Sequence, residues 1–365
     1  MFIEIILALL IGTLAGIFTG LVPGIHINLV GAIIISLSVS VLSNIPIIYL
    51  VVFIVSMSIT HVFIDFIPSI FLGAPEDGTE LSVLPGHEML KKGLGLQAVK
   101  LASLGCLYGI AIFIILVFPL SLITKSVFQF ILKTNLVPFL LIGVSLNLIL
   151  TEKRKFLAVA VFMISGVLGL TILNIGMKEP LLPLLTGLFG TSSLLLAIKN
   201  NTKIKKQELG KVIKIKTFKP LLTSAITSPL SIFLPAISSG QIAVIGNQFS
   251  KLGKKEFLFM LGAINILTMA FSFLALFLIS KTRTGSAVAV ESLLGVPEKE
   301  VFMLIIITAL VSGLLAFFIS GVLAQKFIVL LQKTDYTKIC IATIMLISVI
   351  TLVVSGFFGL FVLII

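Results

Sequence analysis

Long apolar runs alternate with short polar segments along the chain of 365 residues. A run of about 20 apolar residues can cross the hydrocarbon core of a bilayer as an α-helix. Runs that meet or approach this length lie at 2–22, 45–66, 95–122, 134–151, 156–174, 181–198, 256–280, 301–324 and 338–365. Residues 123–133 are predicted to be a mixed segment. The pattern predicts an all-α polytopic membrane protein.

Two apolar stretches are interrupted by proline and small residues. Residues 1–43 break at GLVPGIHIN (20–28), and residues 220–250 break at FLPAISSGQ (233–241). In the first break, proline removes a backbone donor and glycine frees the backbone, so a new helix can begin there. The stretch 220–250 is too short for two crossings and a turn, which predicts a re-entrant hairpin.

The two halves of the chain follow one plan. Each begins with a broken pair, continues with a long span and a polar loop (67–94 and 281–300), and ends with further spans. GTELSV at 78–83 corresponds to GSAVAV at 285–290. The predicted fold is therefore two inverted-topology repeats with broken or re-entrant helices. Their boundaries are 1–151 and 220–365, joined by a helix pair and basic loop at 152–219.

Composition supports this interpretation and restricts the location of the chain. Hydrophobic residues make up 58% and charged residues only 11%, whereas soluble domains are about a quarter charged. The net charge is +12, but the basic residues fall mainly in short loops, where they set orientation, so no nucleic-acid partner is predicted. The loop 199–219 contains eight lysines and is predicted to be cytoplasmic. The predicted location is the plasma membrane.

The two interrupted tips are candidates for substrate binding. A helix start exposes amide donors and a partial positive charge, which suits an anionic group. Interrupted helices at matching positions of inverted repeats are typical of secondary transporters. The predicted substrate-binding residues are Pro23, Gly24, His26 and Asn28 in the first tip, Ser238, Ser239 and Gly240 in the second, and Gly78, Thr79, Gly285 and Ser286 in the loops. A kink that only eases packing is the alternative.

Acidic residues after the span 45–66 are candidates for ion coupling. Glu76, Asp77 and Glu80 lie within five residues, and carboxylates beside unwound backbone can bind sodium or titrate. His61 and Asp65 are four residues apart, share a helix face, and form either a proton relay or a structural pair. The sequence predicts coupling to H⁺ or Na⁺ through these five residues, with a solvated acidic loop as the alternative for the first three.

The second half has cations where the first has acids. Arg283 follows Lys281 in the loop after the span 256–280. Arg283 could bind a carboxylate or phosphate through two parallel hydrogen bonds, or it could be a charge at the outer surface.

The sequence contains few features that indicate a metal site or an enzyme. The three histidines, His26, His61 and His87, precede residue 90, but no HExxH or paired-cysteine spacing occurs. No GxSxG motif occurs either. We therefore expect no metal, no cofactor and no enzymatic activity.

Three segments resemble a known family. They are GTLAGIFTGLVPGIHINL (12–29), GAPEDGTELSVLPGHEMLKKGLGLQAVKLASLG (73–105) and, less clearly, FLPAISSGQIAVIGNQFSK (233–251). The chain looks like a short, divergent member of the TctA family, the large membrane subunit of tripartite tricarboxylate transporters. The resemblance implies uptake of a small carboxylate driven by an ion gradient, with a small membrane subunit and an extracellular binding protein as partners.

These observations predict a secondary active transporter of a small, carboxylate-like organic anion, working by symport with a proton or sodium ion in the lipid bilayer. One alternative is a carrier of a lipid-linked anion such as polyprenyl phosphate, because its phosphate would use the same helix ends. A membrane-embedded enzyme is the third interpretation.

Overall fold

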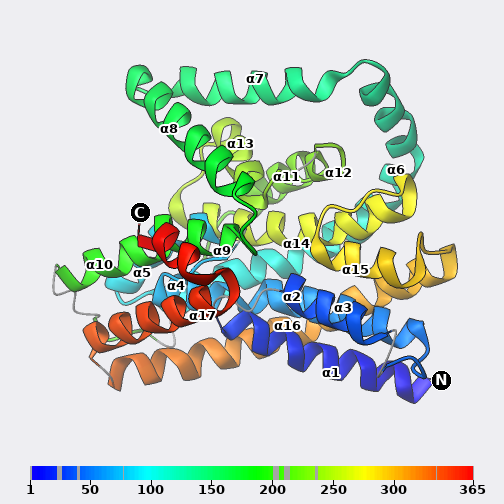
Figure 1. Ribbon diagram of the computed structural model, residues 1–365, viewed down its shortest axis with the longest axis horizontal. Coiled ribbons are helices and arrows are strands. Elements are labelled where there is room, and N and C mark those ends of the chain that lie inside the picture. The colour runs from blue at the N-terminus through cyan, green and yellow to red at the C-terminus, as the bar shows by residue number, and fades with distance from the viewer. Residues whose placement is uncertain are drawn as a thin grey trace.

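The computed structural model describes residues 2–22, 27–38, 42–76, 78–199, 205–208, 214–234, 237–333 and 335–364. Over these ranges the chain is built from helices joined by short connections (Figure 1). Eight of the described helical segments are long and apolar enough to cross a membrane. They are α1 (Phe2–Leu21), α3 with α4 (Ile47–Leu72), α6 (Gly95–Lys133), α8 (Lys155–Asn174), α9 to α10 (Leu181–Lys199), α14 (Lys254–Ile279), α16 (Lys299–Lys333) and α17 (Tyr336–Ile364). The prediction of an all-α polytopic membrane protein is confirmed.

The predicted polar loops are more helical than expected. The first contains α4 (Phe66–Leu72), the 3₁₀ turn η1 (Glu80–Ser82) and α5 (Val83–Lys91), and the second contains α15 (Gly285–Leu294). The predicted mixed segment 123–133 simply continues α6. The physical reason is that backbone groups away from water need partners, and a helix supplies them within the segment.

Both interrupted stretches are broken in the structure. In the first half, α2 (Ile27–Ser38) follows α1. In the second half, α11 (Phe218–Thr227) and α12 (Leu230–Phe233) precede α13 (Ser239–Ser250). The order broken pair, long helix, loop, short helix and long helix thus occurs in each half. The inverted relation between the halves, the re-entrant path of 220–250 and the side of the basic loop stay predictions.

Two long helices form the centre of the protein. α3 with α4 and α14 are buried along most of their lengths, and α1, α6 and α16 pack around them. The backbones approach closely at glycines: a Cβ added at Gly105 of α6 would lie 1.9 Å from the carbonyl oxygen of Phe259 in α14. In α1, Gly12, Gly16 and Gly20 recur every four residues along the contact with α3. Such small residues let membrane helices gain close van der Waals contact.

One helix pair lies apart from this centre. α7 (Leu136–Thr151) and α8 form an arm at the edge of the molecule, away from α1, α3 and α16 (Figure 1). No residue of α7 is buried, and Ile172 is the only buried residue of α8. We call residues 136–174 the α7–α8 arm.

The close contact between α6 and α14 makes a testable prediction. Replacing Gly105 by alanine should lower the stability of the detergent-solubilised protein by about 1–3 kcal/mol, because a methyl group would overlap a backbone oxygen. Thermal unfolding monitored by circular dichroism measures the change.

A matched control is Gly166→Ala in α8, where an added Cβ meets nothing within 4 Å. This variant should be neutral or slightly more stable, since alanine favours a helix over glycine. Equal melting temperatures for Gly105→Ala and Gly166→Ala would contradict the packing argument.

Candidate functional site

The first part of the site forms where a central helix is interrupted. α3 ends at Ile64, and α4 starts one residue later, after Asp65. α4 in turn ends at Gly73, whose φ of 61° allows its amide to bond back to the carbonyl of Pro68. Glycine accepts this left-handed conformation without strain. The left-handed turn at Gly73 therefore ends α4 and begins the acidic loop.

A buried acid–base cluster lies at this interruption. His61 Nε2 is 3.1 Å from Glu76 Oε2 and 3.9 Å from Asp65 Oδ2, and the three side chains are only 3%, 9% and 4% exposed. On the other side of the ring, His61 Nδ1 is 3.0 Å from the hydroxyl of Thr19 in α1. The distance between His61 Nε2 and Glu76 Oε2 is within the range of an ion pair, which would form if the imidazole were protonated.

The charges of this cluster would not balance if both of its carboxyl groups were ionised. With both carboxyls ionised, one imidazolium leaves a net negative charge in a buried site, which is costly. Asp65 Oδ1 is buried and has no hydrogen-bond partner among the described residues. A proton on Asp65, or a bound cation, would remove that charge. Charged groups inside a membrane protein are typical of ion pathways and proton relays.

A second part of the site is a small cavity of about 160 Å³. It is lined by Ile27, Ile237, Ser238, Ser239, Asn265, Thr268, Met269, Arg283, Thr284 and Gly285. Three helices, α2, α13 and α15, begin at residues that line this cavity. Ser238 caps α13 by accepting a hydrogen bond from the amide of Gln241, and Thr284 caps α15 in the same way with Ala287. Helix N-termini carry partial positive charge, so their convergence favours an anion.

Polar side chains of the cavity add donors to these helix ends. Arg283 donates from Nε (3.0 Å) and Nη2 (2.7 Å) to the carbonyl of Ile232, which fixes the guanidinium beside the cavity. Partial burial lowers the pKa of Arg283, but an arginine remains charged at neutral pH. Asn265 Nδ2 and Thr268 Oγ1 are buried without a partner among the described residues. Because Asn265 Oδ1 accepts from Ser239 Oγ at 3.0 Å, its amide nitrogen is left as a free donor.

The acidic loop connects the cluster to the cavity. Gly78 packs so closely that an added Cβ would lie 2.5 Å from Ser239 Oγ and 2.6 Å from Asn265 Oδ1. Glu80 accepts a hydrogen bond from the Gly78 amide at 2.6 Å. Its other carboxylate oxygen lies 2.0 Å from where a Cβ of Gly240 would be, in the first turn of α13. The loop therefore touches His61 through Glu76 and the start of α13 through Gly78 and Glu80.

The predicted substrate residues fall into three groups. Ser238, Ser239 and Gly285 line the cavity, whereas Gly78 and Gly240 adjoin it. Thr79 and Ser286 are buried elsewhere: the Thr79 hydroxyl accepts from the Glu76 amide, and Ser286 bonds to Ser58 at 2.5 Å. Pro23, Gly24 and His26 lie outside the described residues, and Asn28 is described only as part of the α2 backbone.

The predicted ion-coupling residues do not form a single group. His61, Asp65 and Glu76 meet in the cluster, Glu80 lies against α13, and Asp77 is outside the described residues. Three contributing residues, Thr19, Asn265 and Thr268, are absent from the prediction. Asn265 could have been found, since it is the one asparagine in the apolar run 256–280, where a polar group signals function.

His87 takes no part in the cluster of His61. It is buried, its Nε2 has no hydrogen-bond partner in the described structure, and a Cβ at Gly73 would lie 2.8 Å from its ring. Burial, with a contribution from Lys91, lowers the pKa of His87 to about 4. No group of three metal-ligating side chains suited to an ion occurs among the described residues.

Helices that stop and restart around buried polar residues place this chain among the integral membrane proteins that are built from broken helices. The comparison with known families agrees: the sequence matches the tripartite tricarboxylate transporter TctA family over residues 6–365, essentially the whole chain. The chain belongs to this family, whose members are membrane components of transporters.

A curated relative is also similar over most of its length. The uncharacterised protein MJ1079 of Methanocaldococcus jannaschii is 31% identical over 294 residues, which cover 79% of this chain and 72% of the relative. No solved structure matches the chain.

The pKa of His87 predicts an acid-labile protein. Because the unfolded histidine binds a proton near pH 6.5 and the folded one only near pH 4, stability is complete above pH 6.5 and falls as the pH drops toward 4. The loss should approach about 3 kcal/mol, since each pKa unit corresponds to about 1.4 kcal/mol. Melting temperatures between pH 7 and pH 4.5 would measure it.

Two variants test the cause. His87→Gln should flatten the pH dependence, and Lys91→Gln should make the loss smaller, because removing a neighbouring positive charge raises the pKa of folded His87 toward its unfolded value. A His87→Gln protein that is destabilised by acid as strongly as the wild type would refute the assignment.

Proposed function

We propose that this chain is the membrane subunit of a secondary transporter for a small, carboxylate-like organic anion, coupled to a proton gradient. The observation that carries the proposal is the convergence of three helix N-termini and Arg283 on one cavity. The TctA family membership supports transport of a carboxylate, and the cavity chemistry supports where the anion binds.

Anion recognition follows from the donors around the cavity. A carboxylate there would lie at the positive ends of α2, α13 and α15 and near the guanidinium of Arg283. The unpartnered Asn265 Nδ2 and Thr268 Oγ1 supply hydrogen-bond donors that would otherwise be costly to bury. A volume of about 160 Å³ suits a small metabolite better than a polyprenyl phosphate, whose chain would need further space.

The cluster around His61 supports coupling to protons. Hard cations such as sodium prefer oxygen ligands, but the central group here is an imidazole ring, whose Nδ1 faces Thr19 and whose Nε2 faces Glu76. A proton, in contrast, can move between His61, Glu76 and Asp65 with little rearrangement. The carboxylates alone would also accept sodium. The second test below distinguishes sodium coupling from proton coupling.

The acidic loop supplies a route for coupling. Glu76 would change its contact with His61 when the cluster gains or loses a proton, and the same short loop places Gly78 and Glu80 against the start of α13. Glu80 brings a carboxylate to the first turn of α13, where a substrate carboxylate would also be favoured. Protonation of the cluster and binding of the anion would therefore each shift the position of the same acidic loop.

The remaining expectations extend the family assignment. We infer that the chain works in the plasma membrane with a small membrane subunit and an extracellular binding protein, as the tripartite family name and the family's general organisation suggest. The binding protein would deliver the anion, and this chain would carry it across the bilayer.

Arg283 gives the first test of the proposed function. Arg283→Gln should reduce the kcat/KM for uptake of a labelled carboxylate into proteoliposomes by about tenfold or more, because a charged hydrogen bond is worth about 1.5–3 kcal/mol. Lys281→Gln, an exposed neighbour in the same loop, is the matched control and should transport normally.

Since Arg283 also holds the carbonyl of Ile232, the melting temperature must be compared in parallel. Arg283→Lys keeps the charge and should recover part of the uptake. Normal uptake by a folded Arg283→Gln protein would disprove the assigned anion site.

His61 gives the second test. His61→Gln should abolish accumulation driven by an inward proton gradient but keep exchange of labelled for unlabelled substrate, because exchange needs the anion site and not net proton transfer. Both assays use the same proteoliposomes. Proton-driven accumulation by the variant, or accumulation that follows an imposed sodium gradient at constant pH, would count against proton coupling.

A further inference from the structure

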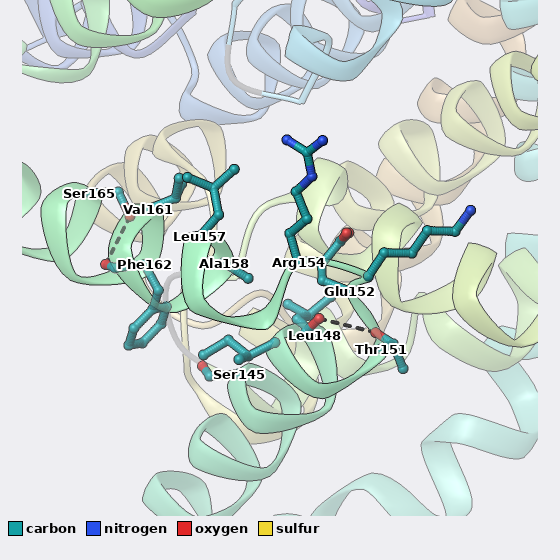
Figure 2. Close-up of a pocket in the computed structure, with 12 residues that line it drawn as sticks. Ser145, Leu148, Thr151, Glu152, Arg154, Leu157, Ala158, Val161, Phe162 and Ser165 are labelled. Carbon is teal, nitrogen blue, oxygen red and sulfur yellow. Dashed lines mark hydrogen bonds between the residues drawn. The ribbon is translucent and has the colours of Figure 1, made fainter.

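A second pocket lies in the α7–α8 arm and shares no lining residue with the proposed transport site. It is a groove of about 830 Å³ between the two helices of the α7–α8 arm (Figure 2). Its walls are mainly apolar, from Leu148 and Ile149 of α7 and from Leu157, Val161 and Phe162 of α8. Ser145 and Ser165 lie farthest along each helix from the turn that joins them, so the groove follows both helices for several residues.

One end of this groove is strongly basic. The turn between the helices contributes Lys153 and Arg154 to the lining, and Lys155 follows at the start of α8. Glu152 is the one acidic residue among the lining residues, against two lining cations and the adjacent Lys155. Arg154 is the N-cap residue of α8, and no side chain caps that helix end. The helix dipole therefore adds to the positive field of the turn.

We propose that this groove binds an anionic phospholipid. The groove is charged at one end and apolar along its length, which is the same distribution of polarity that a phospholipid has. The phosphate would lie beside Arg154 and the first turn of α8, and an acyl chain would lie along Leu148, Leu157 and Phe162. Basic clusters next to membrane helices are typical recognition sites for anionic lipid headgroups.

The surroundings of the groove favour a lipid over a soluble phosphate or a second protein chain. α8 is an apolar helix long enough to span a membrane, so its exposed apolar residues need an apolar environment. A free phosphate would use the basic turn alone and leave the apolar walls empty. A second polypeptide would need a negative group at one end of an apolar ridge to match the groove, whereas an anionic phospholipid has this arrangement by its structure.

The groove lies next to α13, the helix that follows the break in the second interrupted stretch. In α7, Asn147 donates to Gln248 Oε1 at 2.5 Å, and Gln248 donates in turn to Thr151 at 3.1 Å. Gln248 belongs to α13, the helix whose first turn lines the proposed anion cavity. A lipid in the groove would therefore stabilise the contact between the α7–α8 arm and α13.

Lipid retention is the direct experiment. The full chain is purified in detergent, incubated with phosphatidylglycerol or phosphatidylcholine, and examined by native mass spectrometry. We expect phosphatidylglycerol to be retained preferentially. The variant Lys153→Gln/Arg154→Gln should lower that preference about 25-fold, since each of the two surface cations contributes roughly fivefold. The double variant Lys125→Gln/Lys133→Gln, which removes two exposed lysines from α6, is the matched control and should bind as the wild type does.

A second variant separates the groove from the charges. Ala158→Phe would fill the apolar part of the groove without changing any charge, and it should also reduce phosphatidylglycerol retention. If inorganic phosphate displaced the bound lipid as strongly as added phosphatidylglycerol does, the lipid assignment would be overturned. Binding would then need only the basic turn and not the apolar walls. Equal retention by the wild type and both groove variants, or a dimer that excludes lipid from the groove, would overturn it as well.

Discussion

Buried helix ends are the feature on which the rest of this structure depends. A helix that stops inside a membrane protein leaves amides and carbonyls without partners, and no water in the hydrocarbon region can satisfy them. In this chain α2, α13 and α15 begin around one cavity, and α4 ends inside the protein at Gly73. The buried polar chemistry collects at these points because elsewhere the helices satisfy their own backbones.

Close packing of the long helices makes such interruptions tolerable. Glycines let α6 approach α14, and α1 approach α3, until side chain and backbone atoms are in direct contact. The tightly packed α3 and α14 carry His61 and Asn265, and both side chains lie close to the acidic loop. The proposed coupling would act through this loop, because the loop contacts residues of both helices.

The α7–α8 arm differs from the core in this respect. It has no close glycine contacts to the centre, and its side chains are almost all exposed. Its helices therefore depend on the surrounding membrane and on the few polar bonds through Gln248 rather than on a packed core. A lipid bound between the two helices is consistent with that dependence.

The sequence by itself determined the class of this protein and much of its outline. Hydrophobic length identified the spans, because only helices of about 20 apolar residues satisfy a backbone in lipid. Proline and glycine marked both broken stretches, since those residues act locally on the backbone. The ionisable residues His61, Asp65 and Glu76 stood out because polar side chains are costly in an apolar setting.

Only the tertiary structure decided which of these residues meet. Glu76 contacts His61 whereas Glu80 lies against α13, although the two acids are four positions apart in the chain. Asn265 and Arg283 join Ser239 at one cavity because α13, α14 and the loop after α14 pack together. Local sequence rules govern where a helix breaks, but contacts between distant segments arise from packing, which no local pattern specifies.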